Sequence, residues 1–390
     1  MKNSSSSSNR RNFIRDTAAL AAGMAIAPSF IPESASAKTI YEPAVYVPQK
    51  PIETRLKFAV IGINHSHIYG MINAVTKGGG EMVAYYIKEA DLAAQFAKRY
   101  PKVKQAKSEN EILEDPTIQV VLSSGIPLDR APLGIRVMQH GKDYLVDKPG
   151  VITLDQFAEV KKVQKQTGRI YSILFSERFE SRATVRAGEL VKSGAIGKVI
   201  QTVNLAPHKM SPSTRPEWFF DPKYCGAILT DIGSHQFDQY LFFTGSKKAE
   251  ITASQMGNVN HPQYPKLYDF GDVMLHGDGG MGYIRLDWFT PKGLSTFGDG
   301  RLTILGTEGY IEVRKTIDLA GKPGGDHLFL ANNEGVKYID CSKDNLPFGE
   351  LFVNDVLNRT ETAMPQAHCF LATELALLAT KKAKILDVHL

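Results

Sequence analysis

The chain has 390 residues, of which 43% are hydrophobic and 22% are charged, with a formal net charge of +5. A chain of this length is too long for one ordinary hydrophobic core, so we expect a globular protein of two domains. The small positive excess predicts no nucleic-acid partner, and three scattered cysteines are too few for a disulfide framework or a zinc cluster.

Residues 1–37 have the composition of an export signal. The paired arginines Arg10 and Arg11 precede a modest apolar run from Thr17 to Ile31, and the small residues Ala35-Ser36-Ala37 follow that run. This order is typical of a twin-arginine signal peptide with a cleavage site directly after it. We therefore expect a mature periplasmic protein, without membrane insertion after cleavage, that begins with a short arm over residues 38–54.

Residues 55–175 alternate short apolar runs with amphipathic segments. Runs such as Phe58-Ala59-Val60-Ile61 lack polar alternation, which is typical of strands buried on both faces of a parallel sheet. The repeated order of strand and helix predicts an α/β Rossmann domain with a doubly wound sheet, whose ligand site lies at the carboxyl ends of the strands. The predicted strands are 56–61, 82–87, 118–122, 143–146 and 170–175, and the predicted helices are 68–75, 92–100, 128–140 and 154–167.

The first predicted strand runs into Gly62-Ile63-Asn64-His65-Ser66, where a dinucleotide site usually has a glycine-rich turn. Only Gly62 matches that pattern, while Asn64 tolerates left-handed backbone angles and can replace the second glycine. Amides at the start of the following helix would still face a pyrophosphate. The acidic residue expected at the end of the second strand is missing, and Lys88 there can accept a 2′-phosphate, so NAD and NADP are both candidates.

Lys148 stands at the tip of another predicted buried strand, in the segment Val146-Asp147-Lys148-Pro149. At the carboxyl edge of the sheet it would lie beside the nicotinamide. A partly buried amine in that place can give or take the proton of a substrate hydroxyl.

Asp231, His235 and Asp238 follow one another at intervals of four and three residues within Tyr224–Asp238. This spacing places three titratable groups on one face of a helix. Apolar neighbours such as Ile228 predict that the helix is buried. Burying charged groups costs free energy, so we expect these three side chains to have a structural or functional role. We expect the carboxylates to hold the His235 imidazole in one tautomer for acid–base chemistry.

Together these motifs resemble the Gfo/Idh/MocA family, the relatives of glucose–fructose oxidoreductase and inositol dehydrogenase. The family's Glu-Lys-Pro signature corresponds to Asp147-Lys148-Pro149. Its Gly-Gly-x-x-x-Asp-x-x-x-His-x-x-Asp signature corresponds to the segment from Cys225 to Asp238. A strand-turn-strand pattern at 301–309 also matches, so the resemblance covers essentially everything after Arg55.

The resemblance implies roles for individual residues. The catalytic set would be Lys148, Asp231 and His235. Together with the turn sequence it gives a cofactor-binding set of Gly62, Asn64, His65, Ser66, Lys88, Ser123, Ser124, Asp147 and Lys148. Donors and an aromatic face suit a hydroxyl-rich ligand, and the candidate substrate-binding residues are Arg178, His208, Trp218, Asp231 and His235. Further residues that could line the same site are Glu177, Lys209, Arg215 and Tyr283. No metal is expected in this interpretation.

Residues 176–365 predict an α+β domain with an open, mostly antiparallel sheet and helices on one face. An open sheet leaves its other face to be covered, so we expect a homodimer or homotetramer. The C-terminal segment 366–390 should pack a helix back on the core. Besides the motif helix, the predicted elements are helices 181–192, 351–358 and 366–382 and strands 198–205, 251–256, 273–276, 282–288 and 301–305.

These features predict an oxidoreductase that moves a hydride between NAD or NADP and a hydroxyl-bearing carbon of a sugar, cyclitol or related polyol. Lys148 or His235 would take the hydroxyl proton while Asp231 orients the pair. Because the periplasm maintains no pool of free nicotinamide nucleotide, we expect the cofactor to stay tightly bound. It would be restored by a second substrate, or within a redox-neutral cycle that assists elimination or hydrolysis, as in an NAD-assisted glycoside-processing enzyme.

Two other functions stay open. His65 and His67 resemble the metal-binding His-x-His of β/α-barrel hydrolases, and His208, Asp231 and His235 could complete a zinc or manganese site. The later part of the chain lacks the strand–helix alternation of a barrel, which argues against that class. A sugar-binding module without catalysis is the other alternative, and the intact catalytic set argues against it.

Overall fold

The structure is a computed structural model that describes residues 54–388 of the chain. The predicted export signal, residues 1–37, and nearly all of the predicted arm, residues 38–54, lie outside the described residues. Within the part that is described, no helix is both long and apolar enough to cross a membrane.

The first part of the described chain forms a six-stranded parallel sheet in the order β3-β2-β1-β4-β5-β6. Strands β4, β5 and β6 are buried along their whole length, as expected for strands covered on both faces. This order confirms the predicted Rossmann topology, in which the direction of winding reverses between β1 and β4. The strands are β1 (Leu56–Ile61), β2 (Gly80–Tyr86), β3 (Lys104–Gln105), β4 (Val120–Ser123), β5 (Asp143–Asp147) and β6 (Tyr171–Leu174).

Helices connect these strands. Helix α6 has the predicted bounds because both of its ends are readable in the sequence: the Thr153 side chain accepts from the backbone N–H of Gln156, and Gly168 ends the helix with φ 63°. The short elements β3 and α4 were missed. The helices are α2 (Ile68–Lys77), α3 (Ala90–Arg99), α4 (Glu109–Leu113), α5 (Pro127–Gln139) and α6 (Leu154–Thr167).

The second sheet has nine strands in the order β14-β13-β12-β11-β7-β10-β9-β8-β15. All neighbouring strands are antiparallel except the pairs β7–β10 and β8–β15, so the predicted open, mostly antiparallel sheet is confirmed. Its strands are β7 (Val199–Pro207), β8 (Ala249–Gly257), β9 (Phe270–Gly277), β10 (Gly280–Asp287), β11 (Arg301–Gly306), β12 (Gly309–Arg314), β13 (His327–Asn332), β14 (Gly335–Asp340) and β15 (Lys384–Ile385).

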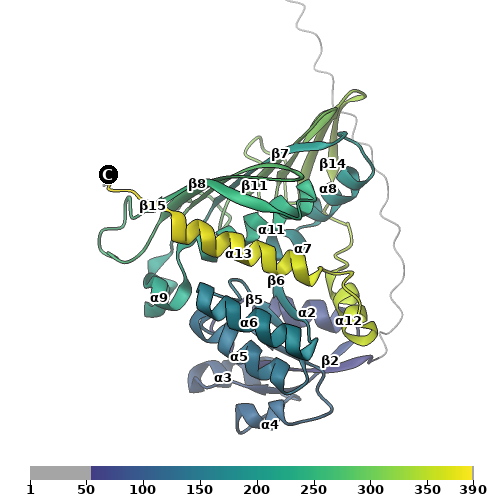
Figure 1. Cartoon of the computed structure of the whole chain (residues 1–390), viewed down its shortest axis with the longest axis vertical. Coiled ribbons are helices and arrows are strands. Elements are labelled where there is room, and N and C mark those ends of the chain that lie inside the picture. Colours follow the sequence, from purple (N-terminus) through teal and green to yellow (C-terminus); the bar gives the residue numbers. More distant parts are fainter. Residues whose placement is uncertain (1–53, 389–390) are drawn as a thin grey trace, which may run out of the picture. The chain divides into compact units, whose positions relative to one another are not determined.

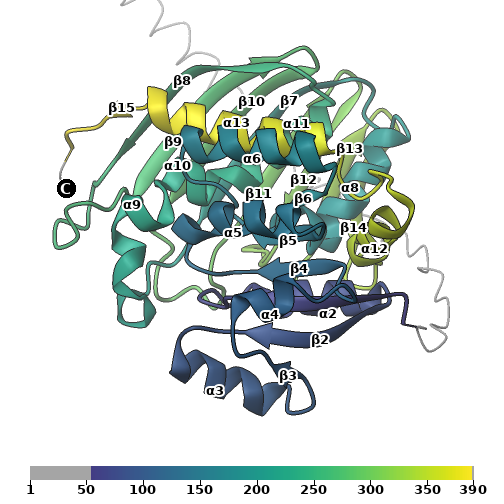
Figure 2. The same cartoon turned by 60° about the horizontal axis from the view of Figure 1, so that its bottom comes forward.

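The helices of the second part are α7 (Ser176–Phe179), α8 (Arg182–Lys192), α9 (Pro222–Cys225), α10 (Ile228–Asp231), α11 (Gly233–Thr244), α12 (Phe348–Asn358) and α13 (Gln366–Lys382). Helices α8, α10, α11 and α13 pack on one face of the second sheet, on the side of the parallel sheet (Figure 1; Figure 2). Helix α11 packs on β7 and β10, and α13 packs on β8, α11, α6 and β6, so α13 contacts both sheets. Helix α12 instead packs on α2, and α9 packs on α5.

Gln366, at the start of α13, closes the outer edge of the parallel sheet. Its side-chain oxygen accepts from the backbone N–H of Tyr171 in β6, and its side-chain nitrogen donates to the carbonyl of the same residue, both at 2.9 Å. The amide group thus makes the two hydrogen bonds that a further strand would make. The C-terminal helix therefore satisfies backbone groups at the β6 edge of the Rossmann sheet.

The motif segment becomes helical later than predicted. Cys225 ends α9, and Gly226, with φ 78°, separates it from α10. Only Ile232 interrupts the helical run from Ile228 to Thr244. Asp231 and His235 thus lie on neighbouring turns of a buried helical segment, as expected, but Cys225 does not belong to it.

Candidate active site

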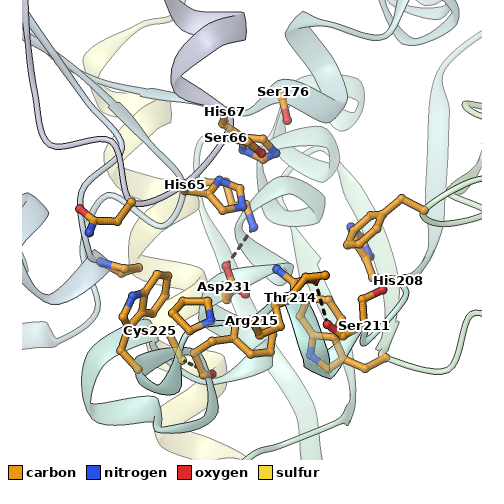
Figure 3. A pocket seen from close by; sticks show the side chains of 18 of the residues that line it. His65, Ser66, His67, Ser176, His208, Ser211, Thr214, Arg215, Cys225 and Asp231 are labelled. Carbon is orange, nitrogen blue, oxygen red and sulfur yellow. Dashed lines mark hydrogen bonds and ion pairs between the residues drawn. The ribbon is translucent and has the colours of Figure 1, made fainter. Parts of the chain in front are cut away.

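A cavity of about 560 Å³ opens at the carboxyl edge of the parallel sheet, facing loops of the second sheet (Figure 3). The loop after β1, the end of β5, helices α7, α10 and α11 and the segment after β7 all contribute side chains. The polar lining residues are Asn64, His65, Ser66, His67, Arg130, Lys148, Ser176, Glu177, His208, Ser211, Thr214, Arg215, Asp231 and His235.

Lys148 and Asp231 form an ion pair at the centre of this lining. The Lys148 Nζ atom donates to Asp231 Oδ1 at 2.9 Å, and the two side chains are 10% and 16% exposed. Burial by itself would raise the pKa of the Asp231 carboxyl, but the Lys148 ammonium outweighs burial and holds that pKa below its usual range. The pair presents a fixed ammonium to a ligand in the cavity.

His235 lines the same cavity one helical turn after Asp231. It is 2% exposed, and its Nδ1 atom is buried without a hydrogen-bond partner among the described residues. Burial lowers the pKa of His235 to about 3, so the ring is neutral at ordinary pH. A neutral ring with an unused nitrogen can exchange a hydrogen bond with a ligand hydroxyl.

The expectation that two carboxylates hold the His235 ring is wrong. Asp231 binds Lys148, and Asp238 lies a further turn along α11, where it is fully buried away from the cavity lining. A buried carboxylate needs a cationic partner, and for both aspartates a cation from a distant segment meets this need better than a neutral imidazole.

Arg178 is one of these distant cations, and the structure takes it out of the predicted substrate-binding set. Its Nε and Nη2 atoms donate to both carboxylate oxygens of Asp238, at 2.6 and 2.7 Å. The His368 ring contacts the same carboxylate at 2.8 Å. Arg178 is 7% exposed and does not line the cavity, because this two-pronged pairing satisfies its charge in the interior.

The loop after β1 has the features of a pyrophosphate site. Gly62 turns the chain with φ 74°, and a Cβ atom there would lie 3.2 Å from the Cα of Gly125 in the loop after β4. The backbone N–H groups of Asn64, Ser66 and His67 have no acceptor within residues 54–388. Unpaired amides before a helix bind phosphate oxygens well, so this turn fits a dinucleotide although two of its usual glycines are absent.

Asn64 does not adopt the left-handed backbone that the sequence suggested, since it is not among the described residues with positive φ. Its side-chain amide instead donates to the Glu89 carboxylate at 2.9 Å. A carboxylate therefore does lie beside this turn, two residues beyond the position where the acidic residue was expected. Lys88 is exposed and does not line the cavity.

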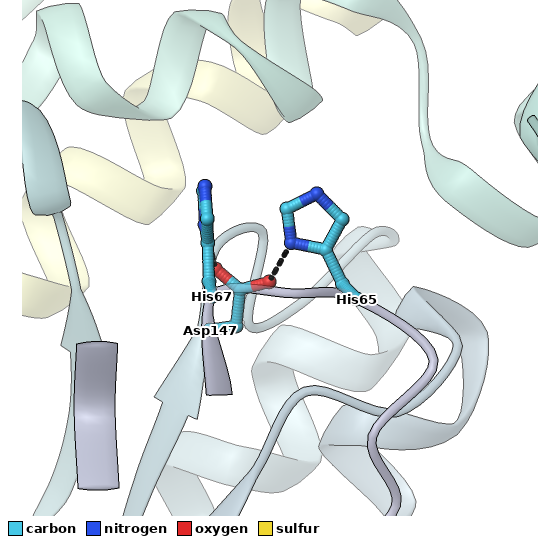
Figure 4. A group of neighbouring side chains, drawn as sticks. All are labelled: His65, His67 and Asp147. Carbon is cyan, nitrogen blue, oxygen red and sulfur yellow. Dashed lines mark hydrogen bonds and ion pairs between the residues drawn. The ribbon is translucent and has the colours of Figure 1, made fainter. Parts of the chain in front are cut away.

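His65 and His67 both turn toward the buried carboxylate of Asp147 (Figure 4). Their Nδ1 atoms lie 3.0 and 2.9 Å from its two oxygens, and Arg130 Nη2 lies 3.0 Å from one of them. Burial by itself would raise the pKa of Asp147, but His67 and Arg130 outweigh burial and hold it well below its usual range. Burial also lowers the pKa of His65 to about 4.

The same three residues have the spacing of a metal site. One ligand atom each from His65, His67 and Asp147 lie within 4.8 Å of one another. Arg130, however, contacts the same carboxylate, and its positive charge opposes a cation there. The group does not include the other ligands that the hydrolase interpretation needs, which are His208, Asp231 and His235.

Ser123 and Ser124 lie at the end of β4, next to this region, but they do not line the cavity. The Ser124 hydroxyl donates to the carbonyl of His65 at 2.6 Å, and the Ser123 hydroxyl accepts from the N–H of Gly125 at 3.2 Å. Both serines are buried. Ser124 thus joins the loops after β1 and β4, whereas the Ser123 contact lies within the loop after β4.

The predicted substrate residues His208 and Trp218 do line the cavity. Glu177 and Arg215, which the sequence offered as further candidates, line the cavity beside them, whereas Lys209 and Tyr283 do not. Glu177 forms a buried ion pair with Lys315 and accepts from the Gln236 amide at 2.8 Å. Glu177 and Lys315 lie 138 residues apart, so no local pattern signals their pairing. The sequence missed the lining residues Trp288 and Phe297.

A Rossmann domain with a free-amide turn, joined to an open-sheet domain that supplies an Asp and a His beside a strand-end Lys, defines an NAD-binding oxidoreductase. Residues 56–175 match the oxidoreductase family with an NAD-binding Rossmann fold, and residues 184–312 match the GFO/IDH/MocA C-terminal domain. The chain belongs to the Gfo/Idh/MocA family, as the motifs predicted.

Known relatives agree with this assignment. A solved structure assigned to the oxidoreductases, from Erwinia carotovora atroseptica SCRI1043, is 42% identical, with a TM-score of 0.83 over 85% of this chain and 100% of its own. The scyllo-inositol 2-dehydrogenase (NAD(+)) of Bacillus subtilis strain 168 is 28% identical over 67% of this chain and 74% of its own length. A levoglucosan dehydrogenase in complex with NADH and levoglucosan shares the fold, with a TM-score of 0.68, 17% identity and coverage of 84% and 98%.

The neutral state of His235 predicts a pH dependence of stability. The ring takes up a proton near pH 6.5 when unfolded but only near pH 3 when folded, so the unfolded state binds more protons between these values. Stability should therefore fall as pH falls through this window. The variant His235→Gln should reduce the slope of unfolding free energy against pH by up to about 1.4 kcal/mol per unit, measured by urea unfolding at several pH values. A wild-type slope in the His235 variant would contradict the neutral state of the folded ring.

Proposed function

We propose that the protein is an NAD(P)-dependent dehydrogenase that acts on a hydroxyl-bearing carbon of a sugar, cyclitol or related polyol. The observation that carries this proposal is the Lys148–Asp231 pair, which stands with His235 in the cavity that the free-amide turn also lines. Similarity to the inositol dehydrogenase supports the substrate class.

The bound nicotinamide supplies the group that accepts or gives the hydride. Lys148 lies where its ammonium can donate to the substrate oxygen, stabilising an alkoxide and returning a proton in the direction of reduction. Asp231 keeps the amine in place through its 2.9 Å hydrogen bond. His235, with a pKa near 3, is too weak a base to hold the proton, so we assign proton transfer to Lys148 and hydroxyl orientation to His235.

Replacing Lys148 with Met should lower kcat by about 10²–10⁴-fold, the range of general acid–base catalysis. Nucleotide affinity, measured by fluorescence titration, should change only a few-fold. Because Lys148→Met leaves Asp231 unpaired in a buried place, the double variant Lys148→Met, Asp231→Asn is needed as a control for stability. The double variant should regain thermal stability but not activity; recovery of activity would remove Lys148 from the chemistry.

We further propose that the protein is exported by the twin-arginine route and keeps its cofactor bound through turnover. Arg10 and Arg11 before an apolar run support the route, and this route carries folded proteins that already hold a cofactor. Reduction of a second substrate, or a redox-neutral cycle through a transient ketone, would then restore the cofactor without release.

Protein recovered from the periplasm should therefore release NAD or NADP on denaturation, close to one nucleotide per chain, and chromatography of the released nucleotide identifies which. Changing Arg10 and Arg11 to Lys should leave the protein in the cytoplasm, whereas Arg15→Lys, outside the pair, should not. Folded periplasmic protein without nucleotide would overturn the retained cofactor; export that ignores the arginine pair would overturn the route.

A homo-oligomer is the third part of the proposal. Met281, Gln201, Leu305 and Tyr310 are directly opposed on β10, β7, β11 and β12, so they form one row across the face of the second sheet. The three large apolar members of this row are 40–46% exposed. Three exposed apolar side chains in one row of an open sheet, interrupted only by Gln201, favour contact with a second copy.

Leu305→Asp should break this contact and shift the mass measured by light scattering toward the monomer. The control is Leu319→Asp, because Leu319 is 62% exposed on a loop outside the sheet. An unchanged mass in the Leu305 variant, or a monomeric wild type at high concentration, would rule out this face as the interface.

A further inference from the structure

Arg215 lines the cavity but has no role in the proposed hydride transfer. It lies between the short 3₁₀ turns Pro212–Thr214 and Glu217–Phe220, in the segment that follows β7. Two isolated bridges, His208 to Gly298 and Lys209 to Phe289, fasten the start of this segment to the loop after β10. The side chain of Arg215 is therefore carried by a fixed loop.

Aromatic rings surround its guanidinium group. The central carbon lies 4.3 Å from the ring centre of Phe219, 5.0 Å from that of Trp288 and 5.5 Å from that of Phe297. The Nε atom donates to the carbonyl of Met210 at 3.2 Å, which sets the plane of the group. Rings on its faces remove water from the charge and leave its outer edge for a ligand.

That edge has no partner in the protein. The Nη2 atom is buried without a hydrogen-bond acceptor in the described part of the chain. The ion pairs of residues 54–388 do not include Arg215. Burial lowers the pKa of Arg215, and the charge of the Asp231 carboxylate acts in the opposite direction without outweighing burial. A desolvated guanidinium without a counter-charge is costly unless a ligand completes it.

The other charged side chains of the cavity are already compensated. Each has a partner within 3.0 Å: Arg130 with Asp147, Lys148 with Asp231 and Glu177 with Lys315. Burial lowers the pKa of the lining histidines His65, His208 and His235, which leaves them neutral. Among the described lining residues, Arg215 therefore leaves the cavity with one uncompensated positive charge.

We propose that Arg215 binds an anionic group of the substrate, which makes the substrate a sugar acid or another polyol with a negative substituent. This inference rests on the proposed function, since it names the substrate class of the same site. A carboxylate matches the planar fork of a guanidinium with two parallel hydrogen bonds, and a phosphate can do the same. A neutral sugar would leave the charge uncompensated.

The two tryptophans of the chain, Trp218 and Trp288, both line the cavity, so their fluorescence reports binding without turnover. Holoenzyme is titrated with matched pairs: glucuronate and glucose, galacturonate and galactose, gluconate and sorbitol, with glucose 6-phosphate as the phosphate arm. We expect acids to bind at least about tenfold more tightly than their neutral partners, with an affinity that falls as salt rises.

Arg215→Gln should abolish this preference, weakening the acids about 10–100-fold and the neutral sugars at most about twofold. Arg215→Lys keeps the charge and guards against misfolding; it should retain part of the preference because it lacks the fork. Lys223→Gln removes an equal charge from an exposed site outside the cavity and should change nothing.

Equal binding of acids and neutral sugars, no response to any acid, or an unaltered preference in Arg215→Gln would each overturn the inference. Turnover assays on the same panel separate it from the dehydrogenase proposal. Acid binding without oxidation of any substrate would leave the role of Arg215 standing and remove the proposed function. If the enzyme oxidises only neutral sugars and Arg215→Gln does not change their oxidation, the proposed dehydrogenase function would stand and the role of Arg215 would fall.

Discussion

The ion pair between Lys148 and Asp231 is the contact on which the site depends. Lys148 directly follows β5 of the parallel sheet, and Asp231 ends α10 beneath the second sheet, 83 residues later. Neither charge would be stable alone at its level of burial, so each of the two parts of the chain supplies the counter-charge of the other. The position of the Lys148 amine therefore depends on how the two parts pack together, and helix α13 contacts both of their sheets.

Around this pair, buried charge is balanced locally. Asp147 is matched by Arg130, Glu177 by Lys315 and Asp238 by Arg178. The interior thus tolerates several ionised groups close to a ligand cavity without a large net field. The guanidinium of Arg215 has no ion-pair partner in the part of the chain that the structure describes, and the cavity carboxylate that acts on it, Asp231, is already paired with Lys148.

The sequence predicted most of the architecture because the signals for it are local. Apolar runs located the strands of the parallel sheet, and the cap residues Thr153 and Gly168 located helix α6 to the residue. No bounds were predicted for strands β12 to β15. β14 has no buried residue and β15 has only two residues, so neither shows a strong apolar pattern, whereas β12 and β13 do contain buried apolar residues.

The motifs located three residues that line the cavity, Lys148, Asp231 and His235, but they did not predict which side chains pair with buried charges. Asp238 and Arg178 lie 60 residues apart, and Asn64 reaches Glu89 across 25 residues. Spacing along a helix made Asp238 look like a partner of His235. The partner of Asp238 is the cation that the fold brings next to it, Arg178, and no pattern within the helix itself predicts that contact.

The side chain of Gln366 that closes the edge of β6 has a consequence for biosynthesis. Tyr171 and Gln366 are 195 residues apart, so β6 stays an open edge while the ribosome makes strands β7 to β14 of the second sheet. At about 5–20 residues per second this takes roughly 10–40 s. An unpaired strand edge is a template for pairing with other chains, so the nascent protein faces its greatest risk of aggregation in that interval. The interval ends when α13 docks and Gln366 pairs with β6. In a chain truncated before residue 366, the edge of β6 would stay unpaired.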